Sequence, residues 1–389
     1  MTLAQLSADA GVGDAANAVS IWIAAARRKS GRNIFITNTP ITIQTNRRAR
    51  RFPRPRRDRT MNIDIVGGGS LGLLLAGKAA RVAGVRVRLI ARTSAQAEGI
   101  ARDGVSVLET SGVERRSRLS CASFDAAVSE PVEADWLWFA TKQTHWSEAL
   151  LAYAAGAAKA GARLLLFQNG VGHAERLAGA GAPPESVFVA VTTEGARKTA
   201  ADAVAHTGAG TTAIGSAGAA ASEAAAADLT GQALPARDVL RAAGFDADVV
   251  PDIERYVRRK LLTNSVINPL TAVLRATNGE LAASPHYRSV MRALFDEAYA
   301  ALTTAADAAD PEAEWRQVLR VCELTAGNHS SMLQDVLGGR ETEIEAITGA
   351  VLRSAAAKGL AAPTNAAMYA MVRGLSSAKV DADSHSRDS

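Results

Sequence analysis

Residues 62–72 read Asn62-Ile63-Asp64-Ile65-Val66-Gly67-Gly68-Gly69-Ser70-Leu71-Gly72, and an alanine-rich helical stretch follows them. The glycines match the spacing G-x-G-x-x-G directly after a short apolar strand. In this fingerprint the first glycine permits a tight turn, the second lets the backbone approach a pyrophosphate, and the third lets helix and strand pack closely. The diphosphate then rests on the N–H groups of a helix N-terminus. The stretch therefore predicts a dinucleotide site formed by Gly67, Gly68, Gly69, Ser70, Leu71 and Gly72.

The end of the second predicted strand indicates which dinucleotide binds. Residues 85–90 form this strand and lead into Ala91-Arg92. An NAD-binding protein carries an acidic residue at such a place for the ribose 2′-hydroxyl, whereas an arginine suits a 2′-phosphate. We therefore predict an NADP(H) site in which Arg92 binds the 2′-phosphate.

The charge is distributed unevenly along the 389 residues. The chain as a whole has a formal net charge of +5 and 48% hydrophobic residues. Residues 1–60 hold twelve basic and three acidic side chains, so the remaining 329 residues hold 32 basic and 36 acidic ones. A slightly acidic body argues against a nucleic-acid surface on the folded part. The length allows a sizeable core and favours two domains.

The basic N-terminal segment is interpreted separately. It contains the run Arg47-Arg48-Ala49-Arg50-Arg51-Phe52-Pro53-Arg54-Pro55-Arg56-Arg57, which predicts a solvated, disordered extension over residues 1–60. An organelle-targeting presequence and a polyanion-binding tail are two functional readings. We favour a third, in which the fold starts at Met61 and residues 1–60 are an upstream extension of a gene model.

Several other features exclude classes of protein and site. No stretch approaches the roughly eighteen apolar residues that a membrane span needs. The two cysteines, Cys121 and Cys322, lie far apart, and the six histidines form no zinc motif. We predict no membrane partner, no disulfide framework and no metal site, and we take the cytoplasm as the default location.

Alternating short β-rich runs and helical stretches predict an α/β fold. Strands are expected at 62–66, 85–90, 105–108, 136–140, 163–167 and 187–191, and helices near 71–83, 145–159 and 172–179. This cadence is typical of a parallel sheet wound on both faces. A hairpin-like pair, 203–206 and 211–214, then turns through Gly208-Ala209-Gly210, residues 216–227 form a loose helix or variable loop, and another helix and strand follow within 228–250.

After Asp252 the strand-like runs disappear. Helical periodicity is found in segments 252–275, 285–308, 312–337 and 342–358, the last opening on a capping box with Thr342 as N-cap and Glu345 three residues later. The predicted organisation is an N-terminal Rossmann dinucleotide-binding domain followed by an all-α C-terminal domain. The boundaries are a basic extension 1–60, the Rossmann domain 61–250, the helical domain 251–376 and a flexible tail 377–389.

The sharpest chemical pattern is Lys260, Asn264 and Asn268, which recur every fourth residue and share one face of a helix. Their neighbours are mainly apolar, and burying an ammonium and two amides without partners is costly. The stripe therefore faces either water or a polar ligand. The amides favour ligand binding, because surface stripes usually carry Glu, Lys and Arg. Pro269 removes a backbone N–H and should kink or end the helix next to Asn268.

Polar residues directly after parallel strands lie at the ligand edge of a sheet. Lys142 follows strand 136–140, Asn169 follows 163–167, and the block Thr192-Thr193-Glu194-Gly195-Ala196 closes 187–191. Lys142 could pair with phosphates or orient substrate, and Asn169 could contact a ribose or a carboxylate, or form a simple Asn-Gly turn. Asn278-Gly279, Asn328-His329-Ser330-Ser331 and Glu343 read first as turn, cap and helix-dipole residues.

Taken together, these residues resemble the 2-dehydropantoate 2-reductase (ketopantoate reductase) family from Met61 to about Leu375. The resemblance is carried by Gly67–Gly72, Thr141-Lys142, Gln168-Asn169-Gly170, Thr192–Ala196, Lys260–Ala272, Asn278–Leu281, Ser330–Asp335 and Thr342–Glu345, in the family's order and spacing. It implies NADPH-dependent reduction of 2-dehydropantoate to (R)-pantoate, on the route to pantothenate and coenzyme A.

The resemblance also implies residue roles. Lys260 would donate the proton to the ketone oxygen, and Asn264, Asn268, Asn278 and Ser331 would bind the keto-acid substrate. Lys142, Asn169, Ala196 and Glu343 would lie at the cofactor. Two alternatives stay open: a reductase of another branched 2-keto acid, and a dinucleotide-sensing protein whose basic N-terminus contacts nucleic acid. A homodimer is one assembly that these features allow, and the 60-residue extension has no counterpart in the family.

Overall fold

The computed structural model describes residues 60–218, 223–304 and 310–385, all within one compact unit, Arg57–Ser389. The predicted N-terminal extension lies outside the described residues, apart from Thr60. An eight-stranded sheet has the order β12-β11-β8-β7-β6-β1-β2-β5. Its strands are β12 (Asp246–Val249), β11 (Thr211–Ser216), β8 (Val187–Thr192), β7 (Arg163–Leu166), β6 (Trp136–Phe139), β1 (Met61–Val66), β2 (Val85–Ala91) and β5 (Ser120–Ser123).

All neighbouring strands of this sheet are parallel except β8 and β11. The strand order reverses at β1, which lies between β2 and β6, so the loop after β1 opens at the topological switch point where doubly wound folds bind ligands. The predicted α/β fold class is confirmed. The six strands predicted between residues 62 and 191 match observed strands to within one residue at each end, whereas the strands predicted at 203–206 and 211–214 each extend two residues further.

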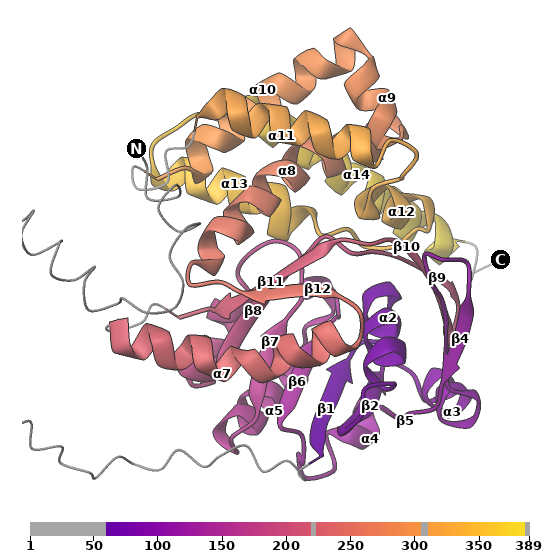
Figure 1. The fold of residues 1–389 in the computed structure, drawn as a ribbon. Coiled ribbons are helices and arrows are strands. Elements are labelled where there is room, and N and C mark those ends of the chain that lie inside the picture. The colour runs from indigo at the N-terminus through magenta and orange to yellow at the C-terminus, as the bar shows by residue number, and fades with distance from the viewer. Residues whose placement is uncertain (1–59, 219–222, 305–309, 386–389) are drawn as a thin grey trace, which may run out of the picture. The chain divides into compact units, whose positions relative to one another are not determined.

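Helices cover both faces of the large sheet (Figure 1). One core lies under α2 (Ser70–Ala79) and α7 (Glu223–Ala242), and includes Leu73, Leu74 and Leu240. The second core lies under α5 (Glu148–Lys159) and α6 (His173–Gly179), and includes Leu150 and Leu177. The short helix α3 (Ser94–Asp103) follows β2, and α4 (Phe124–Ala127) lies between β5 and β6.

A second sheet of four strands, ordered β4-β3-β10-β9, lies beside α2. Its strands are β4 (Glu114–Ser117), β3 (Val105–Leu108), β10 (Ala203–Gly208) and β9 (Gly195–Ala200). The predicted pairing of 203–206 with 211–214 is wrong, because β10 pairs with β3 and β9 whereas β11 pairs with β8 and β12. The chain passes between the sheets at Gly210, where a Cβ would lie 2.4 Å from the Thr193 carbonyl carbon.

After β12 every described element is a helix. These are α8 (Ile253–Leu274), α9 (Asn278–Ala283), α10 (Pro285–Leu302), α11 (Pro311–Leu324), α12 (Ser331–Leu337), α13 (Ile344–Ala357) and α14 (Pro363–His385). α8 contacts each of the other six and also touches β8 and β11. It therefore joins the helical region to the large sheet. α14 continues through most of the segment that the sequence predicted as a flexible tail.

Candidate active site

The glycine loop after β1 has the geometry of a phosphate cradle. Gly67 adopts a φ of 113°, a left-handed conformation that favours glycine. A Cβ on Gly72 would lie 1.8 Å from the Gly67 carbonyl oxygen, so only glycine lets α2 approach β1 this closely. At Gly69, by contrast, a Cβ would meet no heavy atom within 4 Å. The loop is thus tightly packed at Gly72 and open at Gly69. The open side fits a dinucleotide diphosphate at the N-terminus of α2.

Two side chains that sequence reasoning missed hold this loop from outside. Gln96 Nε2 donates to the Gly68 carbonyl oxygen at 2.9 Å and to the Ala201 carbonyl oxygen at 2.7 Å. Lys198 Nζ donates to the same Gly68 oxygen at 2.9 Å, and the Lys198 backbone N–H donates to Ser70 Oγ at 3.0 Å. The only sequence signal for Lys198 is its place two residues after Ala196, on the same face of β9.

Arg92 lies directly after β2, one residue before Thr93, the N-cap of α3. Its side chain is exposed, and it forms no hydrogen bond or ion pair with any residue that the structure describes. An exposed guanidinium at the end of β2 lies on the ribose side of a Rossmann crevice. Its position is therefore compatible with the predicted contact to a 2′-phosphate.

Lys260 reaches from α8 to the carboxyl end of β8. Its ammonium donates to the carbonyl oxygen of Thr192, the last residue of that strand, at 2.7 Å. Burial lowers the pKa of Lys260 to about 8, although the nearby Glu343 carboxylate raises it. The side chain thus lies against the ligand edge of the sheet rather than in bulk solvent.

Asn264 and Asn268 lie on the same face of α8 as Lys260. Asn268 is buried, and neither amide side chain has a hydrogen-bond partner among the residues that the structure describes. Neither amide is among the fully buried polar atoms without a partner, so both groups keep access to solvent and are free to hydrogen-bond to a polar ligand. α8 does not end at Asn268, because it continues through Pro269 to Leu274.

A buried carboxylate joins the start of α13 to two strand ends. Glu343 accepts hydrogen bonds from the Gln143 backbone N–H at 3.4 Å and from Asn169 Nδ2 at 3.3 Å. Gln143 Nε2 also donates to the Asn169 carbonyl oxygen at 2.7 Å. Burial raises the pKa of Glu343, whereas the Asn169 hydrogen bond and the Lys142 charge oppose that rise. The structure therefore brings Asn169, Glu343 and Lys260 to one region.

The predicted capping box at the start of α13 is wrong. α13 begins at Ile344 with Glu343 as its N-cap residue, and no side chain caps it. The Thr342 hydroxyl is buried without a hydrogen-bond partner. The Glu343 carboxylate instead accepts hydrogen bonds from Asn169 and Gln143. These residues are far away in the sequence, so a local pattern could not predict the contacts. A capping box does occur at Thr277 and Glu280, so Asn278-Gly279 opens α9 rather than forming a simple turn.

Ser331 and Asn278 have different surroundings. Ser331 is exposed at the first position of α12, next to Ser330, whose hydroxyl donates a 2.6 Å hydrogen bond to Thr271 Oγ1. Thr271 in turn donates to the Asn268 carbonyl oxygen, which places Ser331 near the amide face of α8. Asn278 Nδ2 donates to Thr325 Oγ1 at 2.8 Å, and its Oδ1 is buried without a partner. No described contact joins Asn278 to Lys260.

Lys142 forms an ion pair across the same region. Its ammonium lies 2.5 Å from Asp335 Oδ1, and Arg340 Nε lies 3.1 Å from the same oxygen. The Asp335 side chain is only 6% exposed. The pair therefore ties the segment after β6 to α12, a role for Lys142 that the sequence did not predict.

Asp335→Asn is expected to lower the free energy of unfolding by about 2 kcal/mol, because it leaves the Lys142 ammonium without its partner. Denaturant titration measures this loss. Arg340→Ala is the control and should cost about 0.5 kcal/mol, since the Arg340 side chain is 57% exposed and the Lys142 pair stays intact. Equal losses in the two variants would contradict a special role for the Lys142 pair.

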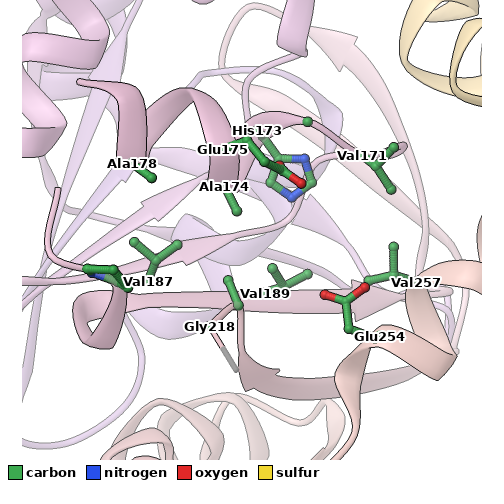
Figure 2. A pocket seen from close by; sticks show the side chains of 13 residues that line it. Val171, His173, Ala174, Glu175, Ala178, Val187, Val189, Gly218, Glu254 and Val257 are labelled. Carbon is green, nitrogen blue, oxygen red and sulfur yellow. The ribbon is translucent and has the colours of Figure 1, made fainter. Parts of the chain in front are cut away.

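A cavity of about 200 Å³ lies elsewhere, between α6, β8 and the start of α8 (Figure 2). Its lining is mostly apolar, with Glu175 and Glu254 as its acidic members. Burial raises the pKa of Glu254. None of the predicted site residues lines this cavity, so it is separate from the glycine loop and the Lys260 region.

Two further findings concern the described residues alone. None of their helices combines the length and apolar character that a bilayer span requires. They also contain no group of three or more His, Cys, Asp or Glu side chains suited to hold a metal ion.

Two segments of the chain match models of one known protein family. Residues 63–219 match the family model described as ketopantoate reductase PanE/ApbA, and residues 252–376 match its C-terminal model. The 2-dehydropantoate 2-reductase of Archaeoglobus fulgidus is 33% identical over 321 residues, which cover 82% of this chain and 99% of that relative.

Two solved structures show the same fold. The probable 2-dehydropantoate 2-reductase of Bacillus subtilis is 31% identical, with a TM-score of 0.64 over 81% of this chain and all of that chain. A D-mandelate dehydrogenase in a ternary complex with NADH and anilino(oxo)acetate is 24% identical, with a TM-score of 0.70 over 82% of this chain and 99% of that chain. The second likeness concerns the fold alone.

Proposed function

This chain belongs to the ketopantoate reductase family of oxidoreductases, and from that premise we propose that it reduces 2-dehydropantoate to (R)-pantoate with NADPH. One observation carries the proposal more than any other. The Lys260 ammonium lies at the carboxyl end of β8, on the same helix face as two amides that lack partners among the described residues. That arrangement offers a proton donor and neutral hydrogen-bonding groups at the edge of a dinucleotide-binding sheet.

The proposed chemistry assigns proton transfer to Lys260. When bound, NADPH would supply a hydride to the carbonyl carbon of the substrate. The ketone oxygen gains negative charge as this happens, and the Lys260 ammonium stabilises that charge and donates a proton to it. A pKa of about 8 keeps Lys260 largely protonated at neutral pH, yet makes it a stronger acid than an ordinary lysine. The Thr192 carbonyl oxygen orients the ammonium in the meantime.

The remaining assignments are carried over from the resemblance to the family. Asn264, Asn268, Asn278 and Ser331 are proposed to bind the carboxylate and hydroxyl of the substrate without adding net charge. The glycine loop, Arg92, Lys142, Asn169, Ala196 and Glu343 are proposed to form the cofactor side. In this scheme residues 61–250 bind the dinucleotide and residues 251–376 bind the substrate. The pantothenate route and a cytoplasmic location belong to the same proposal.

A second candidate is the reduction of another branched 2-keto acid, because the fold itself also occurs in a D-mandelate dehydrogenase. In either case side chains around α8 and α12 are proposed to set substrate specificity, because one fold supports many activities.

The proposed function is tested by following NADPH oxidation with a panel of 2-keto acids. We expect the highest kcat/KM with 2-dehydropantoate and a much lower value when NADH replaces NADPH. A preference for a substrate without the terminal hydroxyl would support the second candidate instead. Arg92→Asp should weaken NADPH binding selectively, because it replaces a cation at the 2′-phosphate by an anion. Equal use of NADH and NADPH by the wild type would contradict the NADP(H) assignment.

A further inference from the structure

We propose that Lys198 is a second cation for the 2′-phosphate of the cofactor, acting together with Arg92 to select NADP(H) over NAD(H). This inference rests on the NADP(H) assignment made above and adds a specificity-determining residue to it. Its basis is the position of β9, which crosses the glycine loop and brings a lysine from the small sheet to the large one.

The backbone and side chain of Lys198 are both fixed at the loop. The Lys198 N–H donates to Ser70 Oγ at 3.0 Å, and Nζ donates to the Gly68 carbonyl oxygen at 2.9 Å. Gln96 Nε2 donates to that same oxygen, and Gln96 lies in the first turn of α3. Arg92 lies four residues before Gln96, so this shared carbonyl oxygen links Lys198 to the segment that carries Arg92.

Among the described residues, the cations Arg92 and Lys198 have no acidic partner. Burial lowers the pKa of Lys198, and the positive charge of Arg92 lowers it further. Among the described residues, no acidic side chain forms an ion pair with Arg92 or with Lys198. Two cations held near each other without an acid are stabilised by an anion placed between them.

The position favours a 2′-phosphate over the diphosphate. The diphosphate is expected at the open N-terminus of α2, in front of Gly69. Gly68 lies one residue earlier, on the side of the loop that faces the end of β2, where the adenosine ribose of a Rossmann fold is bound. Inorganic phosphate and the 2′-phosphate of the cofactor present the same kind of anionic group. Each is therefore used as a separate probe.

The test measures binding rather than turnover, with purified full-length protein. Lys198→Gln removes the charge but keeps an N–H donor for the Gly68 carbonyl, and Lys198→Arg keeps the charge. Arg197→Gln is the matched control, because Arg197 is the adjacent cation on the opposite face of β9. Dissociation constants are determined for NADPH, NADH, adenosine 2′,5′-bisphosphate, 5′-AMP and inorganic phosphate.

We expect Lys198→Gln to weaken NADPH and adenosine 2′,5′-bisphosphate about tenfold, equivalent to about 1.4 kcal/mol. Binding of NADH and 5′-AMP should change less than about twofold, Lys198→Arg should restore most of the affinity, and Arg197→Gln should have little effect. Inorganic phosphate should bind far more weakly than adenosine 2′,5′-bisphosphate, because it lacks the adenosine contacts.

Three results would overturn the inference. The first is equal weakening of all nucleotides by Lys198→Gln, which would make Lys198 a support of the loop only. The second is an equal loss in Arg197→Gln, which would indicate general attraction by surface charge. The third is unchanged NADPH selectivity in Lys198→Gln while the wild type prefers NADPH. That third result leaves the proposed function intact, whereas a wild type without any NADPH preference would refute the cofactor assignment as well.

Discussion

Lys260→Met is expected to lower kcat by roughly 10²–10⁴-fold, the range that a positioned proton donor contributes. The Lys260 ammonium is the cationic group that the structure places against the Thr192 carbonyl oxygen at the end of β8. Methionine has a similar length but no proton to give. NADPH affinity should stay within about twofold, because the glycine loop and Arg92 are unchanged. Steady-state kinetics and NADPH titration measure the two quantities separately.

The pH dependence gives an independent check on this role. Lys260 is active as a donor in its protonated form, so kcat/KM should fall as the pH rises through about 8, the pKa of the buried ammonium. The falling limb should be absent in Lys260→Arg, because a guanidinium stays protonated throughout this range. An unchanged limb in that variant would assign it to a different group.

Stability should move in the opposite direction from activity. The pKa of Lys260 is lower in the folded protein than the ordinary lysine value near 10.5, so between about pH 8 and 10.5 the unfolded chain binds more protons. The stability contribution of Lys260 therefore rises with pH across this window, and the burial penalty is greatest below it. Lys260→Met should thus be at least as stable as the wild type at pH 7. Lys159→Met, at the exposed end of α5, is the control for both activity and stability.

High turnover in a folded Lys260→Met variant would show that another group donates the proton. Loss of NADPH affinity together with turnover would instead mean that Lys260 acts in cofactor binding. Either outcome would remove the proposed division between proton donation from α8 and cofactor binding by the sheet.

Gly72→Ala is expected to destabilise the fold by about 3 kcal/mol, since a methyl group cannot be accommodated without moving α2 away from β1. The added Cβ would lie 1.8 Å from the Gly67 carbonyl oxygen, and that oxygen belongs to the backbone. Denaturant titration gives the loss directly. Because α2 carries the N–H groups of the phosphate cradle, NADPH affinity should fall as well.

Gly69→Ala is the matched variant and should separate binding from stability. Gly69 has φ −83° and ψ −171°, a conformation that alanine adopts, and its Cβ would meet no protein atom within 4 Å. We expect a stability loss below about 1 kcal/mol, the cost of a poorer N-cap. NADPH binding should nevertheless weaken at least about tenfold, because the methyl group enters the open side of the loop. Unchanged NADPH binding would place the diphosphate elsewhere.

Local sequence patterns predicted the parts of this protein whose cause is local. The glycine spacing after residues 62–66 predicted the loop, because a left-handed φ at Gly67 and close packing at Gly72 each require that residue type. Strand and helix periodicity predicted the α/β sheet and the helical region after Asp252. The four-residue spacing of Lys260, Asn264 and Asn268 predicted a shared helix face, since helical geometry alone imposes it.

Contacts between segments distant in sequence settled the remainder. The strands 203–206 and 211–214 have the local pattern of a hairpin. In the structure they belong to different sheets, because β10 pairs within the four-stranded sheet and β11 within the eight-stranded one. Thr342 has the local pattern of an N-cap. The neighbouring Glu343 carboxylate instead accepts hydrogen bonds from Asn169 and Gln143, which lie 174 and 200 positions away in the sequence. α8 runs through Pro269 because six helices and two strands support it.

The pairing of Lys142 with Asp335 and the approach of Lys198 to Gly68 are two further contacts between segments distant in sequence. The first joins residues 193 positions apart and the second, residues 130 positions apart, and no periodicity in the chain encodes either. A residue type and its spacing can specify which face of an element carries a charge. Which carbonyl, carboxylate or phosphate meets that charge depends on the packing of the whole chain, because only packing fixes the distance between them.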